Sequence, residues 1–320
     1  MKMHLILAVL ALTLLAAGCQ SGGTVSSDSS FFGGSQGLLI RFLDNAPPAE
    51  ITDASGYPFK IAVSLENAGE WDVLSGEASV VVTGLYPSDF GPYTVADLTR
   101  SLTTDLAGVK KTFDGNKIEG GTEQIILPST TADFRYTPTL QGNALRIPIR
   151  AEVCYEYGTK ATGTYCIRKS GSLTTTTSSV CEISGPKSIQ SSSSPIQIVS
   201  MTESPGGAGS ILLTFRVAHQ GNGEIFKPDT GCGGTIAGST TITDEDVINM
   251  TVNAGSGITV DCMGASGGEV RLDSVGGATV SCRLTGLPTD IDALREVYVE
   301  LQFDYRETKR TDLLIRHLPT

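Results

Sequence analysis

Residues 151–167, AEVCYEYGTKATGTYCI, carry the pattern that decides the fold. Apolar and polar positions alternate, so that Val153, Tyr155 and Tyr157 are each separated by a single polar or charged residue or cysteine. Such alternation is typical of a β-strand with one buried face. The stretch aligns without gaps on residues 299–315, VELQFDYRETKRTDLLI, 148 positions later. The chain therefore repeats this strand pattern.

A second pair of matching segments lies earlier in each half. Residues 59–70 alternate and then end in NAGE, while residues 213–224 alternate and end in GNGE, at an offset of 154. Two matches in the same order, at nearly equal offsets, predict two copies of one β-domain of about 150 residues.

The composition also indicates an all-β chain. Glycine numbers 37, only 18% of residues are charged, and helical periodicity is nearly absent. Gly and Asn lie in the gaps between the alternating runs, as in β-proteins with many turns. We predict two tandem immunoglobulin-like β-sandwich domains, at residues 37–186 and 195–320, joined by a Ser-rich linker at 187–194.

Within each copy, we expect the repeated stretch to fold back on itself as a hairpin. In the first copy, residues 144–157 would pair with residues 162–168, so that Val153 faces Ile167. In the second copy, residues 296–305 would pair in the same way with residues 313–318. Apolar pairs would then share one side of each hairpin.

The N-terminus predicts export and lipid attachment. Residues 5–17 are apolar over a length that suits a signal-peptide core and is short of a membrane span of about 20 residues. The run ends in LAAGC, so we expect a lipoprotein signal peptide at 1–18 and acylation of Cys19. An ordinary secretory signal is the alternative. Residues 19–36 are rich in Gly and Ser and predict a flexible tether. We therefore expect an extracytoplasmic protein held on a membrane through Cys19.

The cysteine count fits this compartment. Seven cysteines become six without Cys19, an even number that suits disulfides in an exported protein. We expect bonds between Cys154 and Cys166, across the first hairpin, and between Cys262 and Cys282. This leaves two cysteines, which either bond to each other across the domains or stay free: Cys181 and Cys232. No C-x-x-C pair is present, so no metal site is predicted.

No catalytic residues are predicted. Two segments match G-x-S-x-G, residues 33–37 in the tether and 264–268 in a loop between strands, and neither has the strand–turn–helix context of a nucleophile elbow. We predict no cofactor. The net charge of −11 disfavours nucleic acid as a partner.

Three further features carry weaker hypotheses. Asp244, Glu245 and Asp246 form the densest acidic cluster, which reads as a solvated loop because EF-hand spacing is missing, although calcium is the alternative. Asn249 begins an N-M-T sequon and is a candidate glycosylation site. Trp71, the only tryptophan, is expected in the core rather than as a ligand platform.

Residues 63–69, VSLENAG, resemble the Asn-x-Gly turn of CARDB-like and other immunoglobulin-like domains on microbial surfaces. The paired β-domains and the Tyr-x-Tyr element look like secreted proteins and lipoproteins of archaea that are poorly characterised. This resemblance implies surface attachment or adhesion and no catalysis. It transfers no functional residue to this chain.

Together these features predict a membrane-anchored surface lipoprotein with a non-catalytic role in binding, adhesion or envelope structure. Its partners would be membrane lipid, through Cys19, and a protein or a glycan. One alternative is a subunit of a filament or envelope complex assembled by β-strand addition at exposed edges. A second alternative is a surface hydrolase on a β scaffold.

Overall fold

The structure is a computed structural model that describes residues 29–54, 56–169, 180–207, 209–234 and 244–318. Phe31–Thr320 forms one compact unit. The predicted signal peptide and Cys19 lie outside the described residues. In the ranges that are described, no helix is long and apolar enough to cross a membrane.

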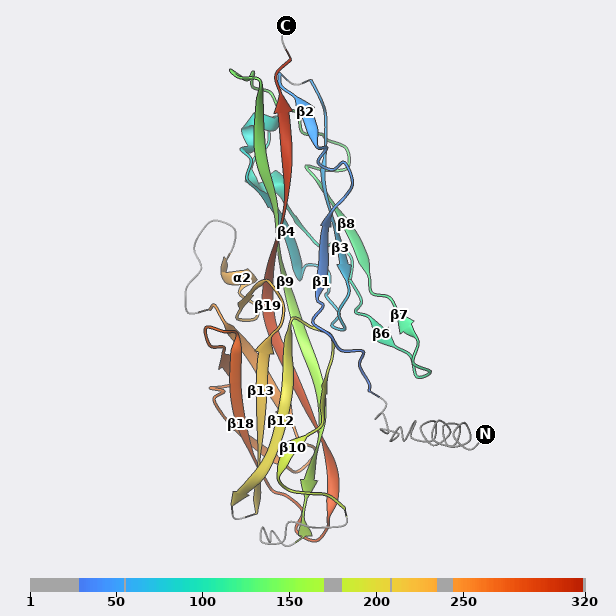
Figure 1. The fold of residues 1–320 in the computed structure, drawn as a ribbon, viewed down its shortest axis with the longest axis vertical. Helices are drawn as coiled ribbons and strands as arrows, with labels where there is room; N and C mark the ends of the chain where they lie inside the picture. The colour runs from blue at the N-terminus through green and yellow to red at the C-terminus, as the bar shows by residue number, and fades with distance from the viewer. Residues whose placement is uncertain (1–28, 55, 170–179, 208, 235–243, 319–320) are drawn as a thin grey trace, which may run out of the picture. The chain divides into compact units, whose positions relative to one another are not determined.

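Almost all of the regular structure is β-strand, which confirms the predicted all-β class (Figure 1). The first half contains β1 (Leu38–Phe42), β2 (Glu50–Thr52), β3 (Ile61–Asn67), β4 (Ala78–Thr83), two 3₁₀ helices η1 (Pro87–Phe90) and η2 (Val95–Leu98), β5 (Thr99–Ser101), β6 (Lys110–Lys111), β7 (Lys117–Ile118), β8 (Thr122–Leu127) and β9 (Ala144–Ile167). The second half contains β10 (Gly185–Lys187), β11 (Ile189–Ser191), β12 (Ile196–Gly207), β13 (Ser210–His219), β14 (Glu224–Phe226), a single turn α2 (Gly231–Gly234), β15 (Val247–Asn253), β16 (Thr259–Met263), β17 (Glu269–Arg271), β18 (Gly277–Thr285) and β19 (Ala293–Arg316).

One large sheet serves both halves. It has the order β17-β15-β19-β9-β4-β5, with β2, β11 and β14 pairing at its sides. A three-stranded sheet, β1-β3-β8, packs against its β4–β9 part, and a five-stranded sheet, β10-β12-β13-β18-β16, packs against the rest. Among the strand pairings of the described residues, only that of β2 with β19 is parallel.

The repeated stretch does not form the predicted hairpins. β9 and β19 are each continuous over 24 residues and pair with each other along their whole length, from Ala144 opposite Arg316 to Ile167 opposite Ala293. The expected pairing of Val153 with Ile167 is therefore wrong, because Val153 lies opposite Glu307. Strands from the two predicted domains thus pair directly.

The local sequence explains why β9 does not turn. The segment between the two predicted arms includes Gly158 and Thr159. Gly158 instead leaves room for the ring of Trp71, because an added Cβ would lie 2.6 Å from a ring carbon. Thr159 is β-branched and favours extended backbone. Its buried hydroxyl is satisfied by Ser194, at 2.8 Å, and by the carbonyl of Ile196.

The strand pairings support the internal repeat. The order β1-β3-β8 in the first half matches β12-β13-β18 in the second. Likewise, β4 pairs with Arg150–Tyr155 of β9, and β15 pairs with Tyr298–Gln302 of β19, which are matching positions at the 148-residue offset. The two sequence matches therefore mark equivalent strands, β3 with β13 and β9 with β19.

The core forms two clusters. The larger lies along β9, β19 and both smaller sheets, and includes Tyr155, Tyr157, Tyr305, Phe215 and Phe303. The smaller lies where β9 begins and β19 ends; its members are Phe59, Phe90, Phe134, Tyr136, Ile149, Leu313, Ile315 and others. Burial of these large side chains is the main stabilising term of the fold.

Candidate functional site: an acidic pocket on the shared sheet

The strand alternation places polar side chains on the outer face of the large sheet. On β9, Tyr155 and Tyr157 point into the core, so Glu156 points outward. On β19, Asp304 points outward and lies directly opposite Glu156. Side chains at opposed positions of an antiparallel pair have Cβ atoms about 5 Å apart. The two carboxyl groups therefore come together although they are distant in the sequence.

These carboxyl groups line a cavity of about 230 Å³, here called the acidic pocket. Glu77 and Asp229 add two more carboxyl groups, and the backbone N–H of Glu156 donates to the carbonyl of Glu77 at 2.9 Å. Trp71 completes one wall. The pocket thus combines an aromatic surface with four acidic residues.

Trp71 is held in place from both sides. Its ring lies against Gly158, and the ammonium group of Lys160 lies 5.0 Å from the ring centroid. Its backbone carbonyl accepts a hydrogen bond of 2.7 Å from the buried amide of Asn67. The ring packs at the edge of the larger core cluster and is half-buried. The prediction of a core tryptophan therefore describes only part of its role.

A loop after β14 closes the other side of the pocket. Asp304 is only 1% exposed because this loop covers it. Its carboxylate accepts backbone N–H groups from Asp229 at 3.3 Å, Thr230 at 2.9 Å and Cys232 at 3.2 Å. A disulfide joins Cys232 to Cys154 on β9. The loop is thus fixed to the sheet by a covalent bond and by a buried carboxylate.

The crowding of carboxyl groups changes their acidity. Loss of hydration, followed by the negative charges of Glu77, Asp304 and Asp229, raises the pKa of Glu156 from 4.5 to about 7. Burial also raises the pKa of Asp304, although the backbone N–H groups that bond to it act in the opposite direction. A positively charged group in the pocket would relieve this repulsion.

The disulfides differ from the sequence prediction in one of two cases. Cys262 is bonded to Cys282, as expected. The predicted bond between Cys154 and Cys166 is wrong: Cys154 is bonded to Cys232, and Cys166 to Cys181. The reason is that both cysteines lie on one extended strand, twelve residues apart, so they cannot meet. All six cysteines after Cys19 are paired, which indicates an oxidising, extracytoplasmic compartment.

The other predicted site residues lie elsewhere. The loop of Asp244, Glu245 and Asp246 is bonded through its backbone; for example, the N–H of Asp246 donates to Ile225. In the ranges that the structure covers, no group of acidic, His or Cys residues is arranged to hold a metal ion. Asn249 is half-buried in β15, between Glu269 and Gln302 of the neighbouring strands.

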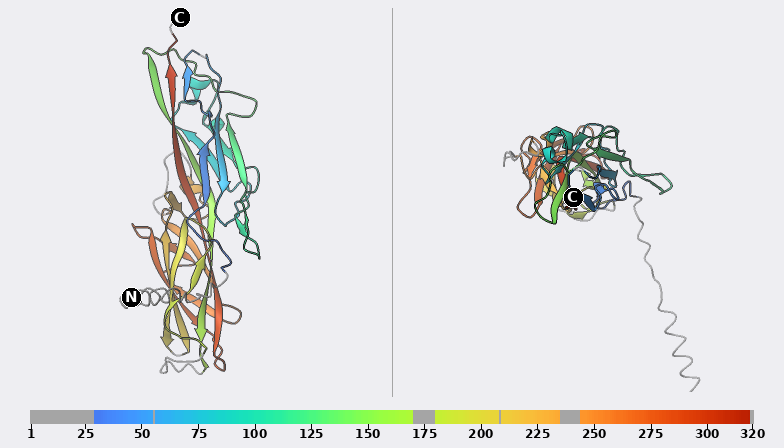
Figure 2. Two further views of the ribbon diagram at one scale, coloured as in Figure 1. Left: turned by 45° about the vertical axis from the view of Figure 1, so that its right-hand side comes forward. Right: turned by 90° about the horizontal axis from the view of Figure 1, so that it is seen from above.

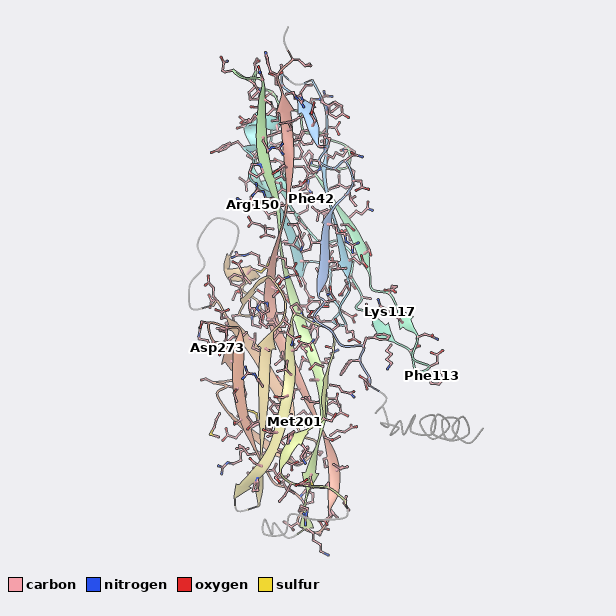
Figure 3. The ribbon with its side chains drawn as sticks, viewed as in Figure 1. Phe42, Phe113, Lys117, Arg150, Met201 and Asp273 are labelled. Carbon is pink, nitrogen blue, oxygen red and sulfur yellow. A yellow bond between two sulfur atoms is a disulfide. The ribbon has the colours of Figure 1, made fainter. Side chains whose placement is uncertain are left out.

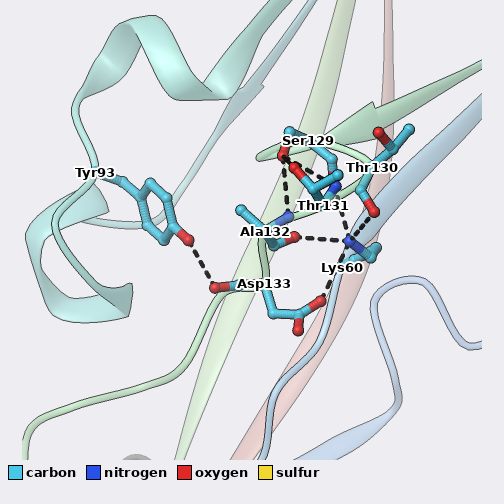
Figure 4. Close-up of polar contacts among 7 residues, drawn as sticks. All are labelled: Lys60, Tyr93, Ser129, Thr130, Thr131, Ala132 and Asp133. Carbon is cyan, nitrogen blue, oxygen red and sulfur yellow. Dashed lines mark hydrogen bonds and ion pairs between the residues drawn. The ribbon is translucent and has the colours of Figure 1, made fainter.

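A second polar cluster is already complete without a ligand (Figure 4). The ammonium group of Lys60 donates to the carbonyls of Ser129 at 2.9 Å, Thr130 at 3.0 Å and Ala132 at 2.7 Å, and lies 3.2 Å from a carboxylate oxygen of Asp133. The lysine itself therefore supplies the cation that these oxygen atoms surround.

In comparisons with known proteins, no family model and no curated protein matches the chain. Sequence reasoning did not single out Glu156 or Asp304. One signal was present, since the two residues are 148 positions apart and are therefore equivalent in the repeat. That equivalence predicts a contact between Glu156 and Asp304 only when the pairing of β9 with β19 is already known.

Proposed function

We propose that this protein is a membrane-anchored, extracytoplasmic binding protein, held through Cys19, whose acidic pocket takes a ligand with a positively charged amino group. The observation that carries the proposal is the cavity beside Trp71 that four acidic residues line. The raised pKa of Glu156 in this cavity agrees with it. Acidic groups that repel one another are stabilised when a cation enters, and Trp71 lines the same cavity.

The protein's own side chains support this ligand class. Lys160 already places an ammonium group over the ring of Trp71. In the second half, the guanidinium of Arg306 lies 4.7 Å from the centroid of the Phe226 ring, and its Nε lies 2.7 Å from a carboxylate oxygen of Glu224. A cation between an aromatic ring and a carboxylate is therefore a stable arrangement in this fold.

Binding fits the pocket better than hydrolysis. A hydrolase with two acidic residues needs both carboxyl groups within reach of the substrate. The carboxylate of Asp304 is covered by the loop and engaged by backbone donors, so only Glu156 of the opposed pair is open. The pocket therefore favours a binding role over a hydrolytic one.

Strand addition remains a second candidate, supported by one specific observation. β1 is an edge strand, and its residues Leu38 and Arg41 line a polar cavity of about 320 Å³ opposite Gln220 and Glu307. An extended peptide could pair with this edge. Native mass measurements over a range of concentrations separate the candidates, because a protein that assembles through β1 would form oligomers.

Calorimetric titration with a simple diamine, cadaverine, tests the binding proposal. We expect binding at about pH 8 and weaker binding at about pH 5, because Glu156 becomes protonated between these values. Glu156→Gln should weaken binding about tenfold at the higher pH and remove most of the pH dependence.

Glu152→Gln is the matched control. It removes the same charge from the same face of β9, but Glu152 bonds to Thr83 and does not line the pocket. Equal effects of the two substitutions, or no diamine binding at either pH, would contradict the proposal. Loss of the protein from the membrane fraction on Cys19→Ala tests the anchor separately.

A further inference from the structure

The hairpin of β6 and β7 carries an aromatic side chain with no cover. It projects from the body in both ribbon views, and Phe113 lies at its tip (Figures 1, 2 and 3). The Phe113 side chain is 100% exposed, and Ile118 on β7 is 52% exposed. Burial of this exposed phenyl ring against an apolar surface would be favourable.

The turn is built to hold this position. The N–H of Thr112 donates to the carbonyl of Asn116 at 2.9 Å, and the N–H of Gly115 donates to the carbonyl of Thr112 at 2.9 Å. Gly115 has a φ of 84°, a conformation that favours glycine. The side chain of Asp114 accepts hydrogen bonds from Thr112 and Asn116. Phe113 is therefore presented by an ordered turn.

Three lysines lie on the same hairpin as Phe113. Lys110 lies 3.6 Å from Asp72, and Lys117 lies 2.7 Å from Glu119. All four side chains of these pairs are about half exposed or more, so each pair is weak and its ammonium group can also meet an external anion. Lys111 is the third lysine. An exposed phenylalanine beside Asp114 at the tip, with lysines on the strands behind it, presents an aromatic ring and amino groups to a bilayer interface.

Chain connectivity brings a membrane within reach. The ammonium group of Lys111 lies 5.8 Å from the centroid of the Phe32 ring, so the base of the hairpin adjoins the start of the compact unit. Phe32 follows Cys19 by 13 residues, and a tether of that length, as predicted from the sequence, would span about 20 Å. A bilayer that held Cys19 would thus lie close to the hairpin.

We propose that the β6–β7 hairpin is a membrane-docking element: Phe113 enters the interfacial region of the bilayer, and Lys110, Lys111 and Lys117 lie beside lipid phosphates. The occupant is the phospholipid surface to which the chain is anchored, so the inference rests on the anchoring part of the proposed function. Docking would limit the rotation that a tether alone allows.

Depth-dependent fluorescence quenching tests the docking. The full chain with Phe113→Trp is reconstituted with vesicles of neutral phospholipid or of an equimolar mixture of neutral and anionic phospholipid. The unsubstituted chain gives the background fluorescence of Trp71. Lipids brominated on the acyl chains should quench the added indole several-fold more than the control. The control is Val275→Trp, at an 82% exposed position in the turn between β17 and β18.

The lysines are tested in the same assay. Lys110→Gln and Lys117→Gln should each reduce association of the tip with anionic vesicles about fivefold, and leave association with neutral vesicles unchanged. Equal quenching at positions 113 and 275, or none at either, would overturn the docking proposal.

Co-sedimentation of the same samples keeps the two proposals distinct. A chain that sediments with vesicles without quenching at position 113 is anchored but not docked. If the Cys19→Ala variant stays on the membrane and quenching at position 113 persists, the chain is docked without the lipid anchor. In that case the anchoring proposal fails and the docking proposal stands.

Discussion

The two halves of the molecule hold an equivalent tyrosine by different partners. Tyr157 donates its hydroxyl to the side-chain oxygen of Asn67 at 3.0 Å. Tyr305 bonds to the ring of His219 at 2.8 Å and accepts the N–H of Gly223 at 2.7 Å. The tyrosine hydroxyl group therefore bonds to a neutral amide in the first half and to an imidazole, which can titrate, in the second half.

A second difference lies one residue later on each strand. Gly158 leaves space over which Trp71 lies, whereas its equivalent, Arg306, stacks on Phe226. The second half thus fills with its own guanidinium the position that the first half leaves without a side chain. The comparison teaches that one glycine, where the repeat has an arginine, makes room for the ring of Trp71, which lines the acidic pocket.

The largest expected effect comes from releasing the loop after β14, which closes one side of the acidic pocket and is joined to β9 by a disulfide. Cys154→Ser with Cys232→Ser opens a bond that spans 78 residues, and should lower the free energy of unfolding by about 4 kcal/mol. Cys262→Ser with Cys282→Ser, which spans 20 residues, should cost about 3 kcal/mol.

Urea unfolding measures the loss of stability in both double variants. NMR titration of Glu156 shows which of the two substitutions changes the acidic pocket. Only the first pair should lower the pKa of Glu156 toward its ordinary value, because Asp229 and Asp304 lose their fixed arrangement. An unchanged pKa in that variant would show that the loop does not shape the pocket.

Removal of the hydroxyl group of Tyr157 or of Tyr305 should lower the free energy of unfolding by less than the loss of a disulfide does. Tyr157→Phe leaves the side-chain oxygen of the fully buried Asn67 without its donor, at a cost of about 2 kcal/mol. Tyr305→Phe should cost about 1 kcal/mol, since His219 is only half-buried and can bond to water. Chemical denaturation of the two variants, side by side, gives the ranking; the reverse order would contradict it.

The smallest expected effect concerns pH. Burial lowers the pKa of His219 below 6.5, although Asp246 acts in the opposite direction. Below pH 6.5 the unfolded chain therefore binds more protons than the folded one, and this residue makes stability fall as the pH falls. His219→Asn replaces the imidazole with an amide, the type of group that bonds to the tyrosine in the first half, and should reduce the loss of melting temperature on acidification. An identical pH profile in the variant would show that His219 does not contribute.

The strand class and the repeat could be predicted from local sequence. The alternation of Val153, Tyr155 and Tyr157 follows from one buried face, which needs no knowledge of the partner strand. The partner of β9 could not be predicted in this way. A hairpin and a pairing with β19 bury the same apolar face, and the choice depends on distant residues such as Trp71, which occupies the space at Gly158.

The site was missed for the same reason. Glu156 and Asp304 are ordinary polar positions on exposed strand faces until the register brings them together. The wrong disulfide between Cys154 and Cys166 also followed from the assumed hairpin. The expected bond between Cys262 and Cys282 is present, and the two residues lie opposite each other on the neighbouring strands β16 and β18.

The pairing of Glu156 with Asp304 has a consequence for how such a chain can change. Because each residue faces its own counterpart in the repeat, a two-fold rotation axis passes between β9 and β19 at this pair, as in a symmetric dimer of identical subunits. In a dimer, every substitution at the axis occurs twice. With both copies in one chain, Gly158 and Cys154 can stand on one side while Arg306 and Gln302 stand on the other. Fusion of the two copies is what permits a single, one-sided pocket on a symmetric framework.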